Sequence, residues 1–162
     1  MGRPPKSATL TYPDVVVSEK GKNGEIVEIR VEDITEDMYR QHIKDFKTSL
    51  IRKYPECFVF VRMEQVERQS SNECLSKLVN CWYLEVFNVG FLDEDWIRSA
   101  WNRILTLGLD REYLQAETQV EGVRSFWKTI EYLSKWEKEG KKCIVWNKDR
   151  MREHLTRYLD WR

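Results

Sequence analysis

Apolar residues recur along the chain with helical spacing in some stretches and with strand-like alternation in others. Spacing of three or four residues predicts four helices, over 36–53, 93–105, 125–139 and 148–158. The first of them follows a capping residue, Asp33 or Thr35, and ends before Pro55. Each helix therefore has one apolar face available for packing against another element.

Runs of β-branched and aromatic residues predict strands between the helices. Four such runs cover 57–65, 79–88, 116–123 and 143–146. Two shorter runs, 15–17 and 25–31, flank the turn signal Asn23-Gly24 and predict a β-hairpin. The polar stretch 67–76 predicts a loop.

The order of these elements predicts an α+β fold. Its central β-α-β-β-α-β run is typical of the ferredoxin-like, split β-α-β arrangement, an antiparallel sheet with helices on one face. The N-terminal hairpin and the C-terminal helix are additions to it. Residues 1–13 hold three of the four prolines and predict a flexible tail, and 14–162 then form a single domain.

Composition narrows the class of protein. The chain has 162 residues, of which 41% are hydrophobic and 33% are charged, so a packed core is expected and a wholly disordered chain is excluded. It contains no apolar run of the roughly 18 residues that a membrane span needs, and no apolar stretch follows the N-terminus as in a signal peptide. We expect a soluble, cytoplasmic protein with no membrane partner.

Charge is balanced overall but divided along the chain. The 27 basic and 27 acidic side chains give a net charge of zero, which argues against coating nucleic acid by bulk charge. Residues 54–123 hold six basic and twelve acidic side chains, and 124–162 hold eleven basic and six acidic ones. A basic C-terminal quarter can therefore form a local site for anions.

Candidate chemistry follows the two strongest strands. Side chains alternate across a strand, so pairing of these strands puts Glu64, Cys81, Tyr83 and Glu85 on one sheet face, while Trp82 and its apolar neighbours face the core. Two interpretations remain open. The residues are a solvated polar face, or they form a functional surface.

The predicted helix 125–139 places Tyr132 between two lysines. Lys128 and Lys135 stand four residues before and three after it, on the side opposite the apolar face. Cations stabilise a phenolate or a nearby phosphate, and a tyrosine can act as a covalent nucleophile. The alternative is an ordinary surface tyrosine on a basic helix.

The motifs over 57–138 resemble, in order and spacing, those of the HUH endonucleases, the rolling-circle replication initiators of plasmids and filamentous phages. The strand Cys81 to Asn88 is similar to their metal-binding strand, and Asp95 to Asn102 to the helix that follows. Tyr132-Leu133-Ser134-Lys135 matches their Tyr-x-x-Lys motif. The resemblance implies that Tyr132 is a nucleophile that attacks DNA phosphorus, with Lys135 beside it.

The same resemblance implies Mg²⁺ or Mn²⁺, held in the family by two histidines two residues apart. Cys81 and Tyr83 stand at these positions here, and the remaining candidate ligands are Glu64, Cys81 and Glu85. A thiolate is a poor ligand for these ions. We therefore interpret the chain as a diverged member that binds DNA with little or no cleavage, although Tyr132 and Lys135 keep nicking and joining open.

Several basic residues are candidates for contact with DNA: Lys128, Lys138, Arg124 and Arg3. Arg3 lies in Gly-Arg-Pro-Pro-Lys, which resembles the core of an AT-hook; the alternative is a basic disordered tail. The expected partners are single-stranded DNA or an origin hairpin, together with replication proteins. The competing hypotheses are a metal-free DNA-binding or regulatory module of a mobile element, and a protein-interaction adaptor that binds no nucleic acid.

Overall fold

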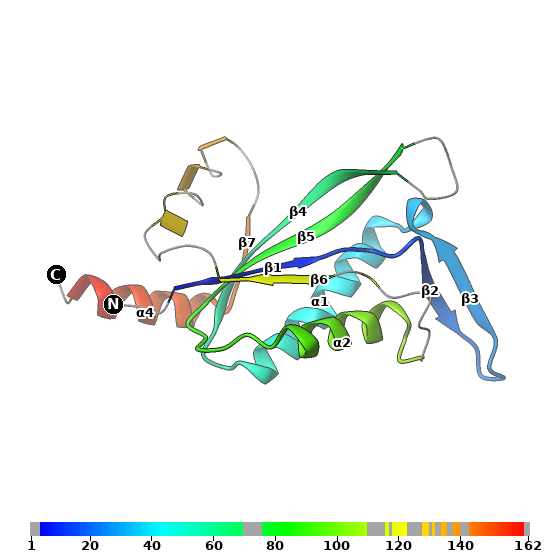
Figure 1. Cartoon of the computed structure of the whole chain (residues 1–162). Coiled ribbons are helices and arrows are strands. Elements are labelled where there is room, and N and C mark those ends of the chain that lie inside the picture. Colours follow the sequence, from blue (N-terminus) through cyan, green and yellow to red (C-terminus); the bar gives the residue numbers. More distant parts are fainter. Residues whose placement is uncertain are drawn as a thin grey trace.

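The computed structural model describes residues 4–69, 76–109, 116, 118–122, 128–129, 131, 134–135, 138–139 and 143–160. These residues form an α+β fold, as the sequence predicts, with a five-stranded antiparallel sheet and a two-stranded sheet (Figure 1). No helix in these ranges has the length and apolar character required to cross a membrane. The strands and helices are β1 (Lys6–Leu10), β2 (Val15–Lys20), β3 (Ile26–Arg30), η1 (Val31–Asp33), α1 (Glu36–Lys53), β4 (Phe58–Gln69), β5 (Ser76–Phe87), α2 (Glu94–Leu105), β6 (Thr118–Glu121), β7 (Ile144–Trp146) and α4 (Lys148–Asp160).

The main sheet has the strand order β6-β1-β5-β4-β7, and every neighbouring pair is antiparallel. Helix α1 connects β1 to β4 by way of the hairpin, and α2 connects β5 to β6. This order of elements and strands is compatible with the predicted ferredoxin-like arrangement. Strand β7 extends the sheet beyond β4.

The prediction of a flexible tail over 1–13 is wrong for the residues that form β1. This strand lies inside the sheet, between β5 and β6, and its Ala8 and Leu10 are buried. The prolines mask the signal because they flank the strand at Pro4, Pro5 and Pro13 and do not interrupt it. A five-residue strand is also too short to stand out by periodicity.

The prediction of a loop over 67–76 is also wrong at both of its ends. β4 continues to Gln69 and β5 begins at Ser76, and these two residues are register partners. Beyond Met63 and Trp82, no other strand in the described part of the chain pairs with this ribbon. The paired ends of the ribbon, Glu67 to Gln69 and Ser76, are polar in sequence, so they lack the apolar alternation by which strands are recognised.

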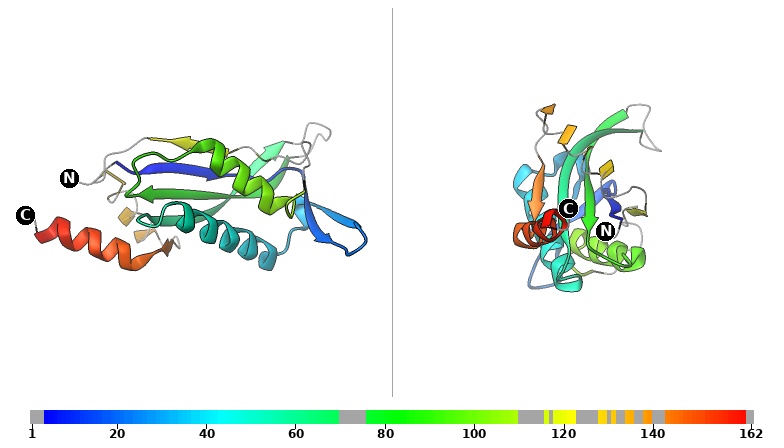
Figure 2. Two further views of the ribbon diagram at one scale, coloured as in Figure 1. Left: turned by 90° about the horizontal axis from the view of Figure 1, so that it is seen from below. Right: turned by 90° about the vertical axis from the view of Figure 1, so that its left-hand side faces the viewer.

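Helices α1 and α2 cover one face of the main sheet (Figure 2). Trp82, Leu84 and Val86 point toward these helices and are buried, as the alternation predicts. Trp101 of α2 is fully buried, and its indole nitrogen donates to the Thr11 carbonyl at 2.6 Å. The core of the protein therefore lies between the sheet and these two helices.

The residues that form the turn of the hairpin and the N-termini of α1 and α2 act largely as the sequence predicts. The hairpin β2–β3 turns at Gly24, whose φ of 81° favours glycine. The hydroxyl of Thr35 accepts a hydrogen bond from the Met38 amide at 3.2 Å, so Thr35, not Asp33, caps α1. Asp93 caps α2 in the same way through the Trp96 amide.

A second, smaller cluster lies on the opposite face of the sheet. Phe58 and Phe87 are fully buried and stack at a centroid distance of 5.0 Å. Met151 and Leu155 of α4 pack against them. Figure 1 also draws the described residues of 128–139 on the side of the sheet away from α1 and α2. The rest of this face carries the residues that the sequence selects as candidates.

Candidate nucleic-acid interface

The pairing of β4 with β5 brings the predicted candidates onto one sheet face. Glu64 lies opposite Cys81, and Glu85 lies opposite Phe60. Tyr83 lies between them along β5, on the same face, and is half-buried. The shared surface predicted from alternation is therefore confirmed, and it is the face opposite the main core.

Arg62 occupies the centre of this face, opposite Tyr83. Its side chain is only 10% exposed; Nη1 lies 2.5 Å from Oε1 of Glu64, and the guanidinium carbon lies 5.1 Å from the centroid of the Tyr83 ring. One cation thus contacts both a carboxylate and an aromatic ring. Sequence reasoning did not select Arg62 as a site residue, although the alternation that selects Glu64 places Arg62 on the same face.

Glu85 has a partner from the N-terminal strand. The hydroxyl of Ser7 in β1 donates to Oε2 of Glu85 at 2.6 Å. Thr9, two residues further along β1, lies opposite Tyr83. β1, which the sequence predicts as part of a tail, therefore supplies part of the candidate surface.

Cys143 lies close to the same charged groups. Burial raises the pKa of its thiol, Arg62 lowers it, and Glu85 raises it further. The thiol is half-buried and contacts the carbonyl of Ile144 at 3.8 Å. The residue before β7 is therefore at the border of this face, where its thiol is kept protonated at neutral pH.

The proposed metal ligands do not form one coordination set. Glu64 and Cys81 are opposite each other, but Glu85 lies four residues along β5 from Cys81, about 13 Å away at roughly 3.3 Å per residue. Mg²⁺ needs oxygen ligands at about 2.1 Å. In the described part of the chain, no group of three or more His, Cys, Asp or Glu side chains is arranged so that it could hold a metal ion. Arg62 already pairs with Glu64, so these residues do not fit Mg²⁺ or Mn²⁺.

Basic side chains lie on the same side of the molecule. Lys128, Lys135 and Lys138 are helical and exposed, and Figure 1 places their segment on the side of the sheet away from α1 and α2. Three other predicted residues lie outside the described residues: Tyr132, Arg124 and Arg3. Of the Tyr-x-x-Lys motif, the structure thus describes only Ser134 and Lys135.

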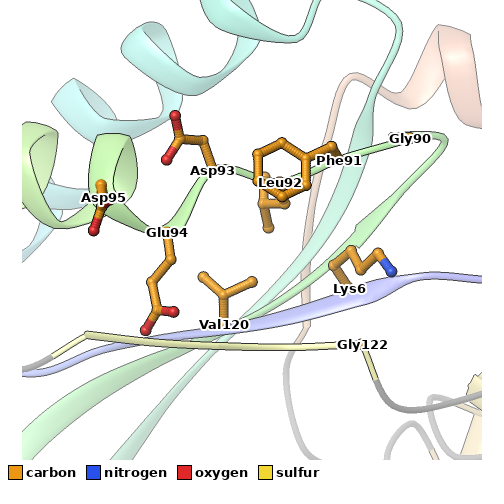
Figure 3. Close-up of a pocket in the computed structure, with 9 residues that line it drawn as sticks. All are labelled: Lys6, Gly90, Phe91, Leu92, Asp93, Glu94, Asp95, Val120 and Gly122. Carbon is orange, nitrogen blue, oxygen red and sulfur yellow. The ribbon is translucent and has the colours of Figure 1, made fainter.

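A separate hollow of about 370 Å³ lies at the end of the sheet, between the start of α2, β1 and β6 (Figure 3). Lys6 and Phe91 border it, and Phe91 is 75% exposed. Its carboxylates have structural roles, because Asp93 caps α2 while Glu94 and Asp95 pair with Arg98. The hollow therefore shows no set of polar groups converging on a ligand.

Comparisons with known proteins add no relative. No family model matches this chain, and no significant match is found among curated proteins or solved structures.

Proposed function

We propose that the protein binds single-stranded DNA across the sheet face opposite α1 and α2, as a diverged protein of the replication-initiator kind. The observation that carries the proposal is the combination of aromatic and cationic side chains on this one side. Tyr83 and Phe60 are half-buried on the face, Arg62 lies between them and Glu64, and exposed lysines lie on the same side.

These groups match the physical needs of single-strand binding. Bases stack on aromatic rings without regard to sequence, and lysines along the path neutralise phosphates. The net charge of zero does not oppose this, because the basic excess is concentrated over 124–162 and acts locally. We expect moderate affinity with a strong dependence on salt.

Fluorescence anisotropy with a labelled 20-nucleotide single strand tests the proposal. If Lys128, Lys135 and Lys138 each contact one phosphate, they account for an affinity loss of about 20-fold between 50 and 200 mM KCl. The triple alanine variant of these lysines should lose that part of the salt dependence. A matched variant at Lys20, Lys22 and Lys44, which are exposed on the hairpin and on α1, should bind as the unaltered protein does.

Two outcomes would contradict the proposal. One is the absence of DNA binding at 25 mM salt. The other is an equal loss of DNA affinity in the two triple-lysine variants, which would indicate only a general effect of charge. In the first case the adaptor hypothesis gains, because exposed apolar side chains at Leu78 (63%) and Phe91 (75%) offer contacts to a protein.

A further inference from the structure

We infer that the Arg62–Glu64 ion pair stands in place of the divalent ion, so that this face holds single-stranded DNA without a metal. The inference rests on the proposed function and adds to it which cation faces the phosphates. It is carried by the position of Arg62 in the sheet and by its two contacts.

The register locates the substitution. The resemblance on which the proposed function draws places its metal-binding side chains at Cys81 and Tyr83, and the cross-strand partners of these two residues are Glu64 and Arg62. The ion pair therefore lies directly across β4–β5 from both positions. Cross-strand partners have Cβ atoms about 5 Å apart, so the guanidinium occupies the space beside Tyr83 that an ion bound there would need.

Electrostatics at this point disfavours a second cation. The carboxylate of Glu64 is already neutralised by Arg62 at 2.5 Å, and a divalent ion beside the guanidinium would be repelled. Cys81 is 7% exposed and offers only sulfur, which Mg²⁺ and Mn²⁺ bind poorly. The pair as a whole carries no net charge, and the guanidinium of Arg62 is held in place because its side chain is only 10% exposed.

A guanidinium can replace part of what a metal ion does for DNA binding. Its planar set of donors suits phosphate oxygens, and its contact with the Tyr83 ring holds that ring as a stacking surface. It cannot generate a metal-bound nucleophile or share a ligand shell with the phosphate. We therefore expect DNA binding that is indifferent to chelators.

The test has one arm with DNA. The affinity for the labelled single strand in EDTA should equal that in 1 mM Mn²⁺ within about twofold, and Arg62→Gln should weaken binding about tenfold in both conditions. Arg40→Gln, on the exposed surface of α1, is the matched control and should change nothing. A gain above tenfold with Mn²⁺ that Glu64→Gln abolishes would overturn the inference, as would unaltered binding by Arg62→Gln.

The second arm needs no DNA. Electron paramagnetic resonance of Mn²⁺ should show no Glu64-dependent binding below 1 mM by the unaltered protein, and tighter binding by Arg62→Gln. Micromolar binding that is lost in Glu64→Gln would overturn the inference even if no DNA is bound. A failure of DNA binding alone would overturn the proposed function and the DNA-binding part of this inference, and would leave the exclusion of a metal ion by Arg62 to be decided by the Mn²⁺ measurement. If thermal melting shows that Arg62→Gln does not fold, the comparison of Mn²⁺ binding between the unaltered protein and Glu64→Gln still tests the inference.

Discussion

The two faces of the main sheet carry side chains from the same strands but differ in the charge and burial of their polar groups. Toward α1 and α2, the polar groups are neutral and buried. The Tyr12 hydroxyl contacts Nδ1 of His42 and accepts a hydrogen bond from the indole nitrogen of Trp82, both at 3.2 Å. On the other face they are charged and partly exposed, as in Arg62–Glu64. Neutral partners satisfy buried groups at low electrostatic cost, whereas charged groups retain an attraction for ligands.

Stability is expected to depend on the face that α1 and α2 cover, and binding on the opposite face. Every large aromatic residue of the helix-side cluster is packed, with Tyr12 meeting Tyr39 and Trp101 at centroid distances of 5.0 and 5.3 Å. The face opposite α1 and α2 keeps Tyr83 and Phe60 half-buried. A change on the first face should therefore act on folding, and a change on the second should act on the DNA binding that we propose.

The largest effect is expected for Trp101→Ala. The side chain is fully buried, and its loss removes both core packing and the hydrogen bond to the Thr11 carbonyl. We expect the free energy of unfolding to fall by about 3–5 kcal/mol, measured by urea denaturation. Phe91→Ala, at a side chain that is 75% exposed, should change it by less than about 0.5 kcal/mol. A loss below about 1 kcal/mol for Trp101→Ala would break the assignment of the main core to this face.

The next effect is a pH dependence that arises from His42. Burial lowers its pKa to about 4, from 6.5 in the unfolded chain, although Asp45 opposes the shift. The unfolded state binds the proton more readily, so this contribution to stability is complete above pH 6.5 and is lost as the pH falls toward 4. The loss attributable to His42 is about 3 kcal/mol.

Urea denaturation between pH 4 and 7 measures this dependence. The control is His42→Gln, whose unfolding should depend less on pH over the same interval, because surface carboxylates titrate equally in both proteins. Identical slopes for the two proteins would show that the polar cluster under the sheet does not hold His42 neutral.

The smallest effect is expected for the covalent reaction with DNA that the resemblance implies. We expect this reaction not to occur. Because the candidate ligands do not fit Mg²⁺ or Mn²⁺, a labelled single strand incubated with Mn²⁺ should form no covalent adduct with the protein. Denaturing gel electrophoresis would detect one. An adduct that disappears in Tyr132→Phe would contradict the metal-free interpretation of the face opposite α1 and α2, and would support the nicking activity that the resemblance implies.

The elements with strong periodicity could be predicted from the sequence. The stripe of α1 and the alternation of β5 give both their type and their buried side, which is why Glu64, Cys81, Tyr83 and Glu85 could be assigned to one face. β1 could not be recognised, because five residues between prolines carry too few positions for alternation to appear. Arg62 was missed for a different reason: its importance lies in its two contacts, and those depend on strand register.

The place of β1 in the sheet has a consequence for the order of folding. Its contacts reach far along the chain, as with Ser7 and Glu85, which are 78 residues apart, whereas α1 and the β4–β5 ribbon need only neighbouring segments. Closing so long a loop costs entropy before any contact is gained. We expect β1 to be among the last strands to dock, and β6 to join the sheet only after β1, with which it pairs. In pulse-labelled hydrogen exchange during refolding, the amides of β1 should therefore become protected after those of β4 and β5. Until β1 docks, the edge of β5 that later pairs with it can pair with another chain. Refolding at high protein concentration should therefore favour domain-swapped dimers in which β1 is exchanged.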